Sequence, residues 1–584
     1  MEETIEQSMK VIASWDYETS DISPNTSLFN HHSREEVLEF MRAIKDLHTT
    51  LQFFTNSSNS HLSHKKYVSC QNLLRVAKKR LSTEFFSLLK VSNKHHFADH
   101  VDDNNNSIEE ANNNQVVFTV SNDDYSTTTE EASTMADLKL IVDCMMSSGF
   151  GKKCLKIYKL TRRSFVDDIL LKLGAHWETI DSKINQWLKS SSICVKVFSH
   201  EKTLCEHLFS ACTLSSVTES CFSEVCKEAA LIWLRIPGKL AKHYLKLYEE
   251  ILEVSSDVDR IFSSEMTSPV RSQLRSSLGR VSEAVKAMLT DFEAYINKDA
   301  SKGLVPGGGT HHLTKNVMNY LVNLSHHAIA LDKILADFPV SLQPPLPESY
   351  FEGETLSSPV ALHFAWLILV LLGKLDSKSE IFKDMALSYL FLVNNLQYVV
   401  RKVKSTKLYS VLREKWINKH TSKVIQYAAN YERMGWGRVI STLPKDLTVE
   451  ISLDKVKECF KRFNVDFEEE YRKQVDWVVQ DPKLRGEMKA SIARKVDARY
   501  RKMYDKYKVV LAKSRERGKI DSVVKFSPED LQNYLSDLLD GSEDDDVVST
   551  NVERGETTSQ DGKENPVLQR RSRRLLLMVR QSNH

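Results

Sequence analysis

The sequence predicts an all-α protein, organised as an elongated rod of consecutive helical bundles. Its 584 residues include only 18 Gly and 13 Pro, well below the usual shares of about 7% and about 5%. Apolar residues recur at steps of three and four through most of residues 135–541, which is helical spacing. Alternating strand patterns and Asn-Gly hairpin turns are missing from the sequence. Few chain breakers and helical spacing together favour long helices joined by short loops.

Residues 1–91 are expected to form a helical hairpin or a coiled-coil-like region. The stretch "REEVLEFMRAIKDLHTTLQFF" is followed by a second helical stretch, "NLLRVAKKRLSTEFFSLL". Steps of three and four in the first stretch make a short heptad seam of Val37, Phe40, Ile44, Leu47, Leu51 and Phe54. The two helices can pair with each other or dock on helices of another protein, and the spacing does not decide between these arrangements.

Three further regions follow along the chain. Residues 92–134, with "DDNNNSIEEANNNQ", are polar, acidic and rich in Asn, so we expect a flexible linker. Residues 135–541 are expected to form the rod, with loops at "LVPGGGTHH", "FPVSLQPPLPES" and "STLPKD". Residues 542–584 are expected to be a disordered tail, first acidic and then rich in Arg and Leu.

The most apolar stretch, "VALHFAWLILVLLGKL", is predicted to be a fully buried helix. Its uninterrupted apolar core is shorter than the ~20 residues that a membrane span needs. The nine cysteines lack metal-like spacing, and Cys205, Cys212, Cys221 and Cys226 fit helical packing better than a zinc knuckle. Core thiols, with no signal peptide at "MEETIEQSMK", indicate a reducing compartment.

A search for catalytic motifs indicates that the protein is not an enzyme and carries no cofactor or metal. The sequence has no phosphate-binding G-x-x-x-x-G-K-[ST] loop, no H-E-x-x-H and no G-x-S-x-G. "PGGGT" is predicted to be a loop. Adjacent histidines such as His311 and His312 are expected to point in different directions on a helix and to chelate poorly.

One basic run stands out against a net charge of only +2. Residues 483–519 hold fourteen Lys/Arg and four Asp/Glu, a net of +10. An apolar stripe should bury one side of this helix and turn its cations to water: Leu484, Met488, Ile492, Val496, Tyr500, Met503, Tyr504 and Tyr507. A solvated face, an anionic membrane and nucleic acid are the three interpretations. Nucleic acid is not expected, because the tyrosines look structural.

The chain ends with "KFSPEDLQNYLSDLLDG" and a second basic stretch. Ser527, Pro528 and Asp530 predict a capped helix start, and Asp540-Gly541 its stop. Beyond it, Arg570, Arg571, Arg573 and Arg574 stand beside "LLLMV". This end can bind a membrane surface, act as a nuclear-localisation-like run or remain an inert tail.

Several ordered motifs resemble one family over about residues 135–541, and more weakly over residues 34–90. They are "SSGFGKKCLKIYKLTRRSFVDDILLKLG", "VMNYL" after "THHLT", "KDMALSYLFLVNNLQYVVRKVK", "WINKHTSKVIQYAANYERMGWGRVI" and "VVKFSPEDLQNYLSDLLDG". The chain is similar to the roughly seventy-kilodalton subunit of the exocyst vesicle-tethering complex, in its plant branch. The resemblance implies the rod fold of multisubunit tethering complexes and a non-enzymatic role linking secretory vesicles to the plasma membrane in exocytosis.

The resemblance also implies partners and a place in the cell. It implies other exocyst subunits at the N-terminal helices, where the six seam side chains from Val37 to Phe54 are the candidate subunit-binding residues. It also implies phosphatidylinositol 4,5-bisphosphate or another anionic lipid at the C-terminal end, and a Rho-type small GTPase. The protein is expected in the cytoplasm and at peripheral plasma-membrane or vesicle sites. An alternative is a scaffold of the same fold without lipid binding, acting in specialised traffic such as autophagy or immunity.

The candidate lipid-binding residues combine the resemblance with the basic run. In the family a lysine pair precedes the last helix. Here Lys525 matches the second lysine, and Ser522 stands in place of the first. Neighbouring cations can compensate, because headgroup attraction is largely additive. The full candidate set is Lys489, Arg494, Lys495, Arg499, Arg501, Lys502, Lys519 and Lys525.

Overall fold

The structure is a computed structural model that describes residues 2–15, 29, 33–56, 64–96, 129–173, 180–210, 215–236, 244–301, 305–338, 358–444, 451–513 and 523–541. Within these ranges the chain is all-α, and its only strand-like feature is a bridge between Val478 and Asp540. The predicted fold class is therefore confirmed. Packing divides the chain into two compact units, Met1–Val285 and Lys286–His584, so that the boundary falls inside the region expected to be one rod.

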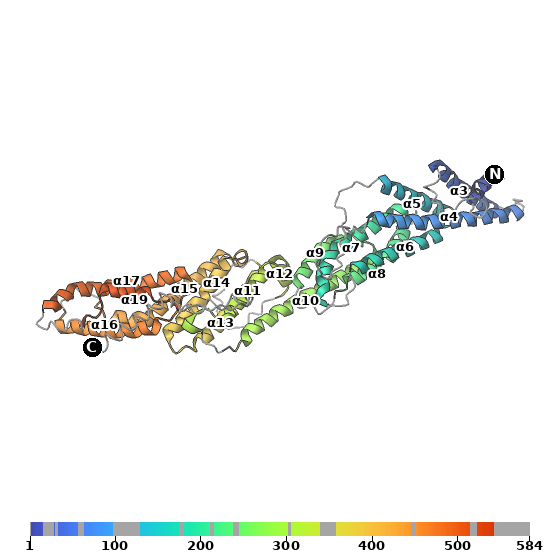
Figure 1. Cartoon of the computed structure of the whole chain (residues 1–584). Helices are drawn as coiled ribbons and strands as arrows, with labels where there is room; N and C mark the ends of the chain where they lie inside the picture. The colour runs from blue at the N-terminus through green and yellow to red at the C-terminus, as the bar shows by residue number, and fades with distance from the viewer. Residues whose placement is uncertain are drawn as a thin grey trace, which may run out of the picture. The chain divides into compact units, whose positions relative to one another are not determined.

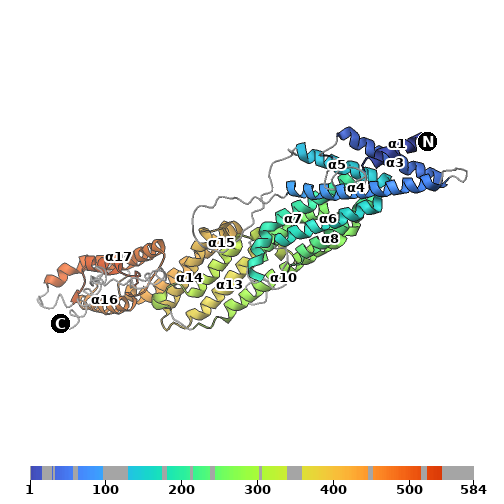
Figure 2. The ribbon, with the colours of Figure 1, turned by 45° about the vertical axis from the view of Figure 1, so that its right-hand side comes forward.

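The elements of the first unit are α1 (Glu2–Ala13), α3 (Arg34–Asn56), α4 (His64–His96), α5 (Thr129–Ser147), α6 (Gly151–Lys172), α7 (Ile180–Leu208), α8 (Ser215–Leu234), α9 (Tyr244–Ile261), η1 (Glu265–Thr267) and most of α10 (Ser268–Lys298). In this unit α4 contacts α1, α3, α5 and α6, whereas α6 also packs on α8 and α7 packs on α9 (Figures 1 and 2). Helix α4 extends into the region expected to be a linker, and α5 begins before that region ends. The rest of the expected linker, residues 97–128, lies outside the described residues.

The heptad seam of α3 packs inside the first unit. Val37, Phe40, Ile44, Leu47 and Leu51 are all buried, and Phe54 is half-buried. Helix α3 contacts α1, α4 and α5, and the ring centroids of Trp15 and Phe40 lie 5.0 Å apart. The seam is therefore filled by helices of the same chain, which corrects the assignment of these six side chains to subunit binding.

The second unit contains the remaining elements. They are the end of α10, η2 (Pro306–Gly308), α11 (His312–Ser325), α12 (Ala328–Leu335), α13 (Pro359–Ser379), α14 (Met385–Lys404), α15 (Leu408–Ser441), α16 (Leu453–Gln474), α17 (Pro482–Lys513) and α19 (Pro528–Ser536). Helices α14 and α15 make the most extensive helix pair of the unit. Helix α15 continues past α14 to contact α16 and α17.

Helix α13 holds the most apolar stretch of the chain. It is the one helix among the described residues that is long and apolar enough to cross a membrane, and 56% of its apolar window is buried in the protein. It packs on α11, α12, α14 and α15. The expectation of full burial needs correction, because Leu369, Val370 and Leu372 line an open pocket of about 580 Å³ together with residues from α10, α14 and α15.

Asn394 joins three distant segments inside the second unit. Its side-chain amide donates to the carbonyls of Gly308 and Val478, both at 2.7 Å, and accepts from the Gln480 amide at 3.1 Å. Gly307 has a φ of +61°, and a Cβ there would lie 2.7 Å from the Asp476 carbonyl, so a side chain at this position clashes. "PGGGT" is thus a structural loop whose glycines allow close backbone packing.

The cysteines described by the structure are free thiols. Cys70, Cys144, Cys154, Cys194, Cys205, Cys221 and Cys226 are buried, and Cys459 is half-buried. Cys212 lies outside the described residues. Burial among helices agrees with the prediction that the cysteines are packing residues.

Candidate functional site

The last helix, α19, begins with the cap that the sequence predicts. The Ser527 hydroxyl accepts a hydrogen bond from the Asp530 amide at 3.1 Å, and the Asp530 carboxylate accepts one from the Ser527 amide at 2.9 Å. Leu531, Tyr534 and Leu535 are buried. This reciprocal capping box fixes where the helix starts, with its N-cap Ser527 two residues after Lys525.

Lys525 is tied to an acid of the same unit. Its ammonium lies 2.5 Å from a carboxylate oxygen of Glu468 on α16, and the two side chains are only 14% and 13% exposed. Burying two charges is costly unless they neutralise each other. Lys525 therefore has a structural role in joining the chain before α19 to α16.

Helix α17 buries the stripe that the sequence predicts. Leu484, Met488, Ile492, Val496, Tyr500, Met503 and Tyr507 are buried, whereas Tyr504 is half-exposed. The Tyr500 hydroxyl donates to the Phe526 carbonyl at 2.7 Å, which fastens α17 to the segment before α19. Because the stripe faces inward, the basic residues of α17 lie on its outer side.

Three of the candidate lipid-binding residues of α17 form ion pairs within the protein, and so does Arg485, which lies 3.4 Å from the Asp540 carboxylate. The Lys489 ammonium lies 2.7 Å from the Asp540 carboxylate. Lys495 pairs with the buried Glu432 of α15. Arg501 contacts Glu529 at 3.2 Å and Asp497 at 3.5 Å, and hydrogen bonding to Glu529 raises the pKa of its guanidinium. Much of the charge counted along the sequence is therefore balanced within the unit.

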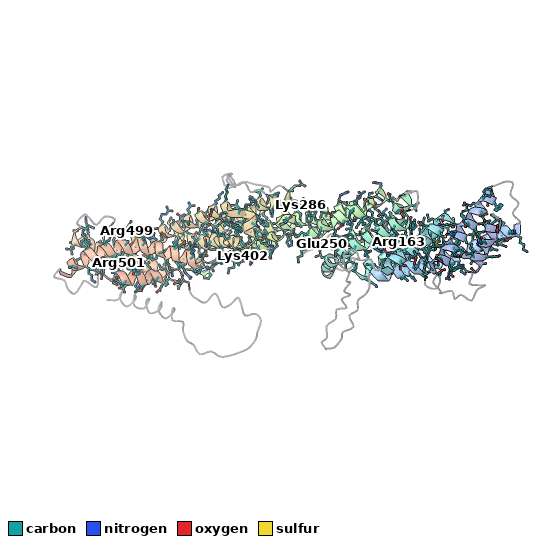
Figure 3. All side chains as sticks on the ribbon, turned by 90° about the horizontal axis from the view of Figure 1, so that it is seen from above. Arg163, Glu250, Lys286, Lys402, Arg499 and Arg501 are labelled. Carbon is teal, nitrogen blue, oxygen red and sulfur yellow. The ribbon has the colours of Figure 1, made fainter. Side chains whose placement is uncertain are left out.

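Arg494, Arg499 and Lys502 are the candidate cations of α17 that have no acidic partner within the described residues. Arg494 and Lys502 are exposed, and Arg499 is half-exposed. Figure 3 labels Arg499 and Arg501 on this part of the second unit. Lys519, Ser522 and the four tail arginines Arg570, Arg571, Arg573 and Arg574 lie outside the described residues.

A second group of cations lies where α14 ends and α15 begins. We call it the basic corner, and it consists of Arg401, Lys402, Lys404, Lys407, Arg413 and Lys415. Figure 3 places Lys402 well away from Arg499 and Arg501 along the unit. The sequence carries a signal for it, since residues 401–423 contain eight Lys/Arg and a single acid, Glu414. The basic corner was not predicted, because this run is shorter than the one in α17.

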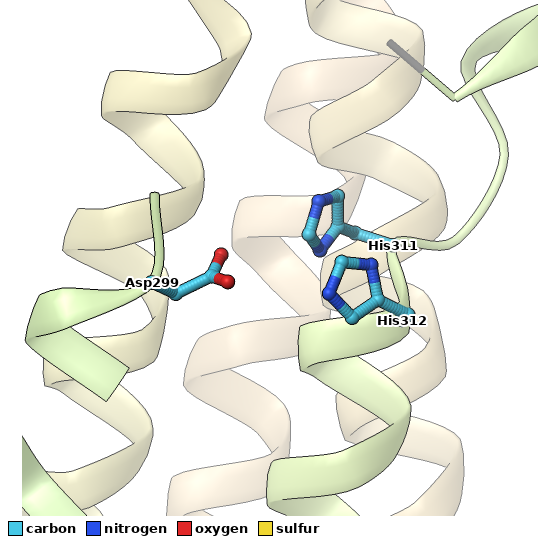
Figure 4. A group of neighbouring side chains, drawn as sticks. All are labelled: Asp299, His311 and His312. Carbon is cyan, nitrogen blue, oxygen red and sulfur yellow. The ribbon is translucent and has the colours of Figure 1, made fainter. Parts of the chain in front are cut away.

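Asp299, His311 and His312 form the cluster among the described residues that comes nearest to a metal-ligand set (Figure 4). Their potential ligand atoms lie within 4.8 Å of one another. The expectation that the two histidines point apart was wrong, because His311 is the extended N-cap of α11 and its ring centroid lies 4.2 Å from that of His312. The expected divergence assumed that both histidines are helical, and only His312 is.

The charge of this cluster is already balanced by Lys378. Its ammonium lies 2.8 Å from the Asp299 carboxylate. Burial opposes ionisation of Asp299, but hydrogen bonds from Lys378 and Ser301 outweigh it and lower the pKa to about 2. The His311 Nδ1 accepts from the Leu313 amide at 3.1 Å, so the proton of the neutral ring is on Nε2. A divalent cation would have to displace Lys378, and the cluster is best explained as a structural ion pair.

Comparison with known proteins identifies the family. The family model for the N-terminal part of the exocyst complex component Exo70 matches residues 4–91, and the model for the C-terminal part of this Exo70 exocyst component matches residues 185–537. The chain is 30% identical over 437 residues to exocyst complex component EXO70B1 of Arabidopsis thaliana, covering 70% of this chain and 67% of that protein. It is 29% identical to EXO70B2 of the same plant, covering 70% and 69%.

Solved structures agree at the level of the fold. The crystal structure of the S. cerevisiae exocyst component Exo70p matches with a TM-score of 0.59 at 15% identity, covering 92% of this chain and 99% of that one. A second Exo70p structure, described together with the Exo84p C-terminal domains, matches with a TM-score of 0.58. With both family models matched along the chain, this protein belongs to the Exo70 family of exocyst complex subunits.

Proposed function

We propose that this protein is a non-enzymatic exocyst subunit that tethers secretory vesicles to the plasma membrane and binds anionic phosphoinositide through the outer face of α17. Family membership supports the tethering role. The observation that carries lipid binding is the group Arg494, Arg499 and Lys502, which are cations with no acidic partner among the described residues. At 100° per residue they fall within an arc of about 140° on the helix.

The mechanism is charge-driven docking. Each basic side chain near a negatively charged leaflet contributes about 1 kcal/mol, and the attraction fades beyond a Debye length of about 8 Å at physiological salt. Lys489, Lys495, Arg501 and Lys525 add less than their number implies, because each is already paired with a carboxylate. Binding should therefore be weak at physiological salt and depend on the unpaired cations.

Contacts with other exocyst subunits are proposed for the N-terminal helices. The buried seam of α3 is not available for them, but apolar side chains stand exposed on α3 and α4, namely Leu38, Phe53, Val68, Phe86 and Val91. Such a set of exposed apolar side chains suits packing against helices of a neighbouring subunit. A Rho-type GTPase contact stays a prediction, and no described feature points to its position.

The test is flotation with liposomes that contain phosphatidylinositol 4,5-bisphosphate, at low and at physiological salt. The α17 triple variant, Arg494→Gln, Arg499→Gln and Lys502→Gln, should bind at least tenfold more weakly than the unmodified chain. A control triple variant, Lys315→Gln, Lys455→Gln and Lys461→Gln, removes equal charge from separate exposed positions of the same unit. Equal binding by the two triple variants would contradict lipid binding through α17.

The scaffold without lipid binding is the second candidate function. It is favoured by the internal pairing of Lys525 with Glu468 and by Ser522 in place of the family's first lysine. Absence of liposome binding by the full chain at both salt concentrations, together with retained capture of other exocyst subunits, would select the scaffold.

A further inference from the structure

We infer that the basic corner at the α14–α15 junction is a second docking surface for anionic lipid headgroups, separate from the α17 face. The inference rests on the proposed function, because it assumes that the second unit works against a negatively charged bilayer. Whereas the proposed function places lipid binding on the α17 face, this inference assigns the stronger electrostatic contact to the corner residues Arg401, Lys402, Lys404, Lys407, Arg413 and Lys415.

The corner concentrates charge within a short stretch of chain. Six cations fall between residues 401 and 415, and the one acid among them is Glu414. Five of the six are exposed, and Lys402 is half-exposed. They come from the last turn of α14, the short connection and the start of α15, so they share one end of a helix pair. A net charge of +5 at one place produces a strong local attraction for anions.

None of the six cations has an acidic partner within the part of the chain that the structure describes. The Arg401 guanidinium lies over the ring face of Tyr398, with 5.8 Å between guanidinium carbon and ring centroid. By contrast, Lys489, Lys495, Arg501 and Lys525 of the same unit each pair with a carboxylate. Unpaired like charges at one helix junction repel one another. The fold tolerates a repulsion that an external anion would relieve.

The backbone at the corner is held in an unfavourable conformation. Arg413 has φ 64° and ψ 175°, and this interrupts the helical geometry of α15. A non-glycine residue in this region costs on the order of 1–3 kcal/mol, and such strain concentrates at functional positions. The kink separates Leu408–Leu412 from the rest of α15. It also places a cation at the point where the two helical segments meet.

The kind of anion follows from the other exposed side chains. Tyr409 is 47% exposed beside Lys407, and tyrosine is enriched where a protein meets the interface of a bilayer. Single-stranded nucleic acid would need several exposed aromatic platforms, whereas Trp416 and His420 nearby are buried and stack on each other with centroids 3.7 Å apart. A bilayer requires only charge density with an interfacial aromatic side chain, which the corner supplies.

The corner is too far from the α17 face to be an extension of it. Lys415 and Glu432, the partner of Lys495, lie in the same helix 17 residues apart. At 1.5 Å per residue this is about 25 Å, which is about three Debye lengths at physiological salt. The two surfaces therefore act on lipid through separate charges, and each can be removed without changing the other.

The experiment compares full-length variants on vesicles of neutral lipid with and without phosphatidylinositol 4,5-bisphosphate. The corner triple variant, Lys402→Gln, Lys404→Gln and Lys407→Gln, is measured beside the α17 triple variant and the control triple variant defined above. We expect about fivefold weaker binding for each lysine removed, hence on the order of a hundredfold for the corner triple variant. Thermal unfolding of each variant shows that it folds, and a charge-restoring Lys→Arg triple variant at the same positions should recover binding.

The outcomes separate the two proposals. Loss of binding in the corner triple variant that exceeds the loss in the control supports the inference, whatever the α17 triple variant does. Loss in the α17 triple variant alone overturns the inference and leaves the proposed lipid site standing. No vesicle binding by the unmodified chain overturns both. Unchanged vesicle binding by the corner triple variant, together with cross-links from the corner to the acidic residues 543–546, also overturns the inference. That result would assign the corner to the chain's own tail.

Discussion

The α17 face and the basic corner have similar compositions but opposite electrostatic surroundings. On and beside α17, four of the candidate cations are paired with carboxylates of α15, α16, α19 or α17 itself, or with Asp540. In the corner, six cations share one acid in sequence and have no acidic partner among the described residues. A run of basic residues therefore does not measure the charge that a surface presents, because acids from other helices decide it.

The largest expected difference is one of stability on acidification, between α15, which carries part of the corner, and α17. Burial, reinforced by the charges of Lys419 and Lys423, lowers the pKa of His420 to about 4, against a hydrogen bond with the Trp416 carbonyl that raises it. The unfolded chain, with a pKa near 6.5, binds the proton more readily. Stability from this group is therefore complete above pH ~6.5 and is lost as the pH falls towards 4, by up to about 3 kcal/mol.

Hydrogen exchange at pH 7 and pH 5 tests this effect region by region. We expect protection to fall more in the part of α15 around His420 than in α17 and α19, since residues 447–541 contain no histidine. The variant His420→Phe should retain protection in α15 at pH 5. An equal loss of protection in α17 would show that His420 is not the cause.

Removing the Lys525 charge should give the next largest effect, a loss of folding stability. Lys525→Met leaves the Glu468 carboxylate, 13% exposed, without its nearest cation, although Arg472 remains at 3.4 Å. Loss of one partner of a buried pair is costly, and we expect about 2 kcal/mol lower stability in denaturant unfolding.

Two variants serve as controls for Lys525. Lys404→Met, in the corner, should cause no loss of stability, because it breaks no ion pair. Lys525→Met combined with Glu468→Leu should recover most of the stability. If Lys525→Met is as stable as the unmodified chain, the pair is not structural and Lys525 is free for lipid.

The smallest expected effect is a gain in stability, on removing a lysine from the corner. Lys404→Gln should raise the free energy of unfolding by a few tenths of a kcal/mol, because it relieves repulsion between exposed like charges. The gain should disappear in 1 M salt, where the Debye length is about 3 Å. Thermal unfolding at low and high salt measures it. A loss of stability in Lys404→Gln would reveal an acidic partner for the corner.

The sequence by itself determined the local structure. Spacing predicted the helices and the buried stripe of α17 through Leu484, Ile492 and Tyr500. Ser527 and Asp530 predicted the capping box, and ordered motifs identified the family. The helices, the stripe and the capping box depend on residues within a few turns of one another, so the order of residues along the chain is enough to specify them.

Only the tertiary structure decided how the charged and apolar faces are used. The partner of Lys495 is Glu432, 63 positions earlier, and the side chains that cover the α3 seam come from α1, α4 and α5. His311 and His312 converge because the chain enters α11 at that point. Each of these contacts depends on how the chain is placed in space, and helical periodicity says which face is buried without saying what covers it.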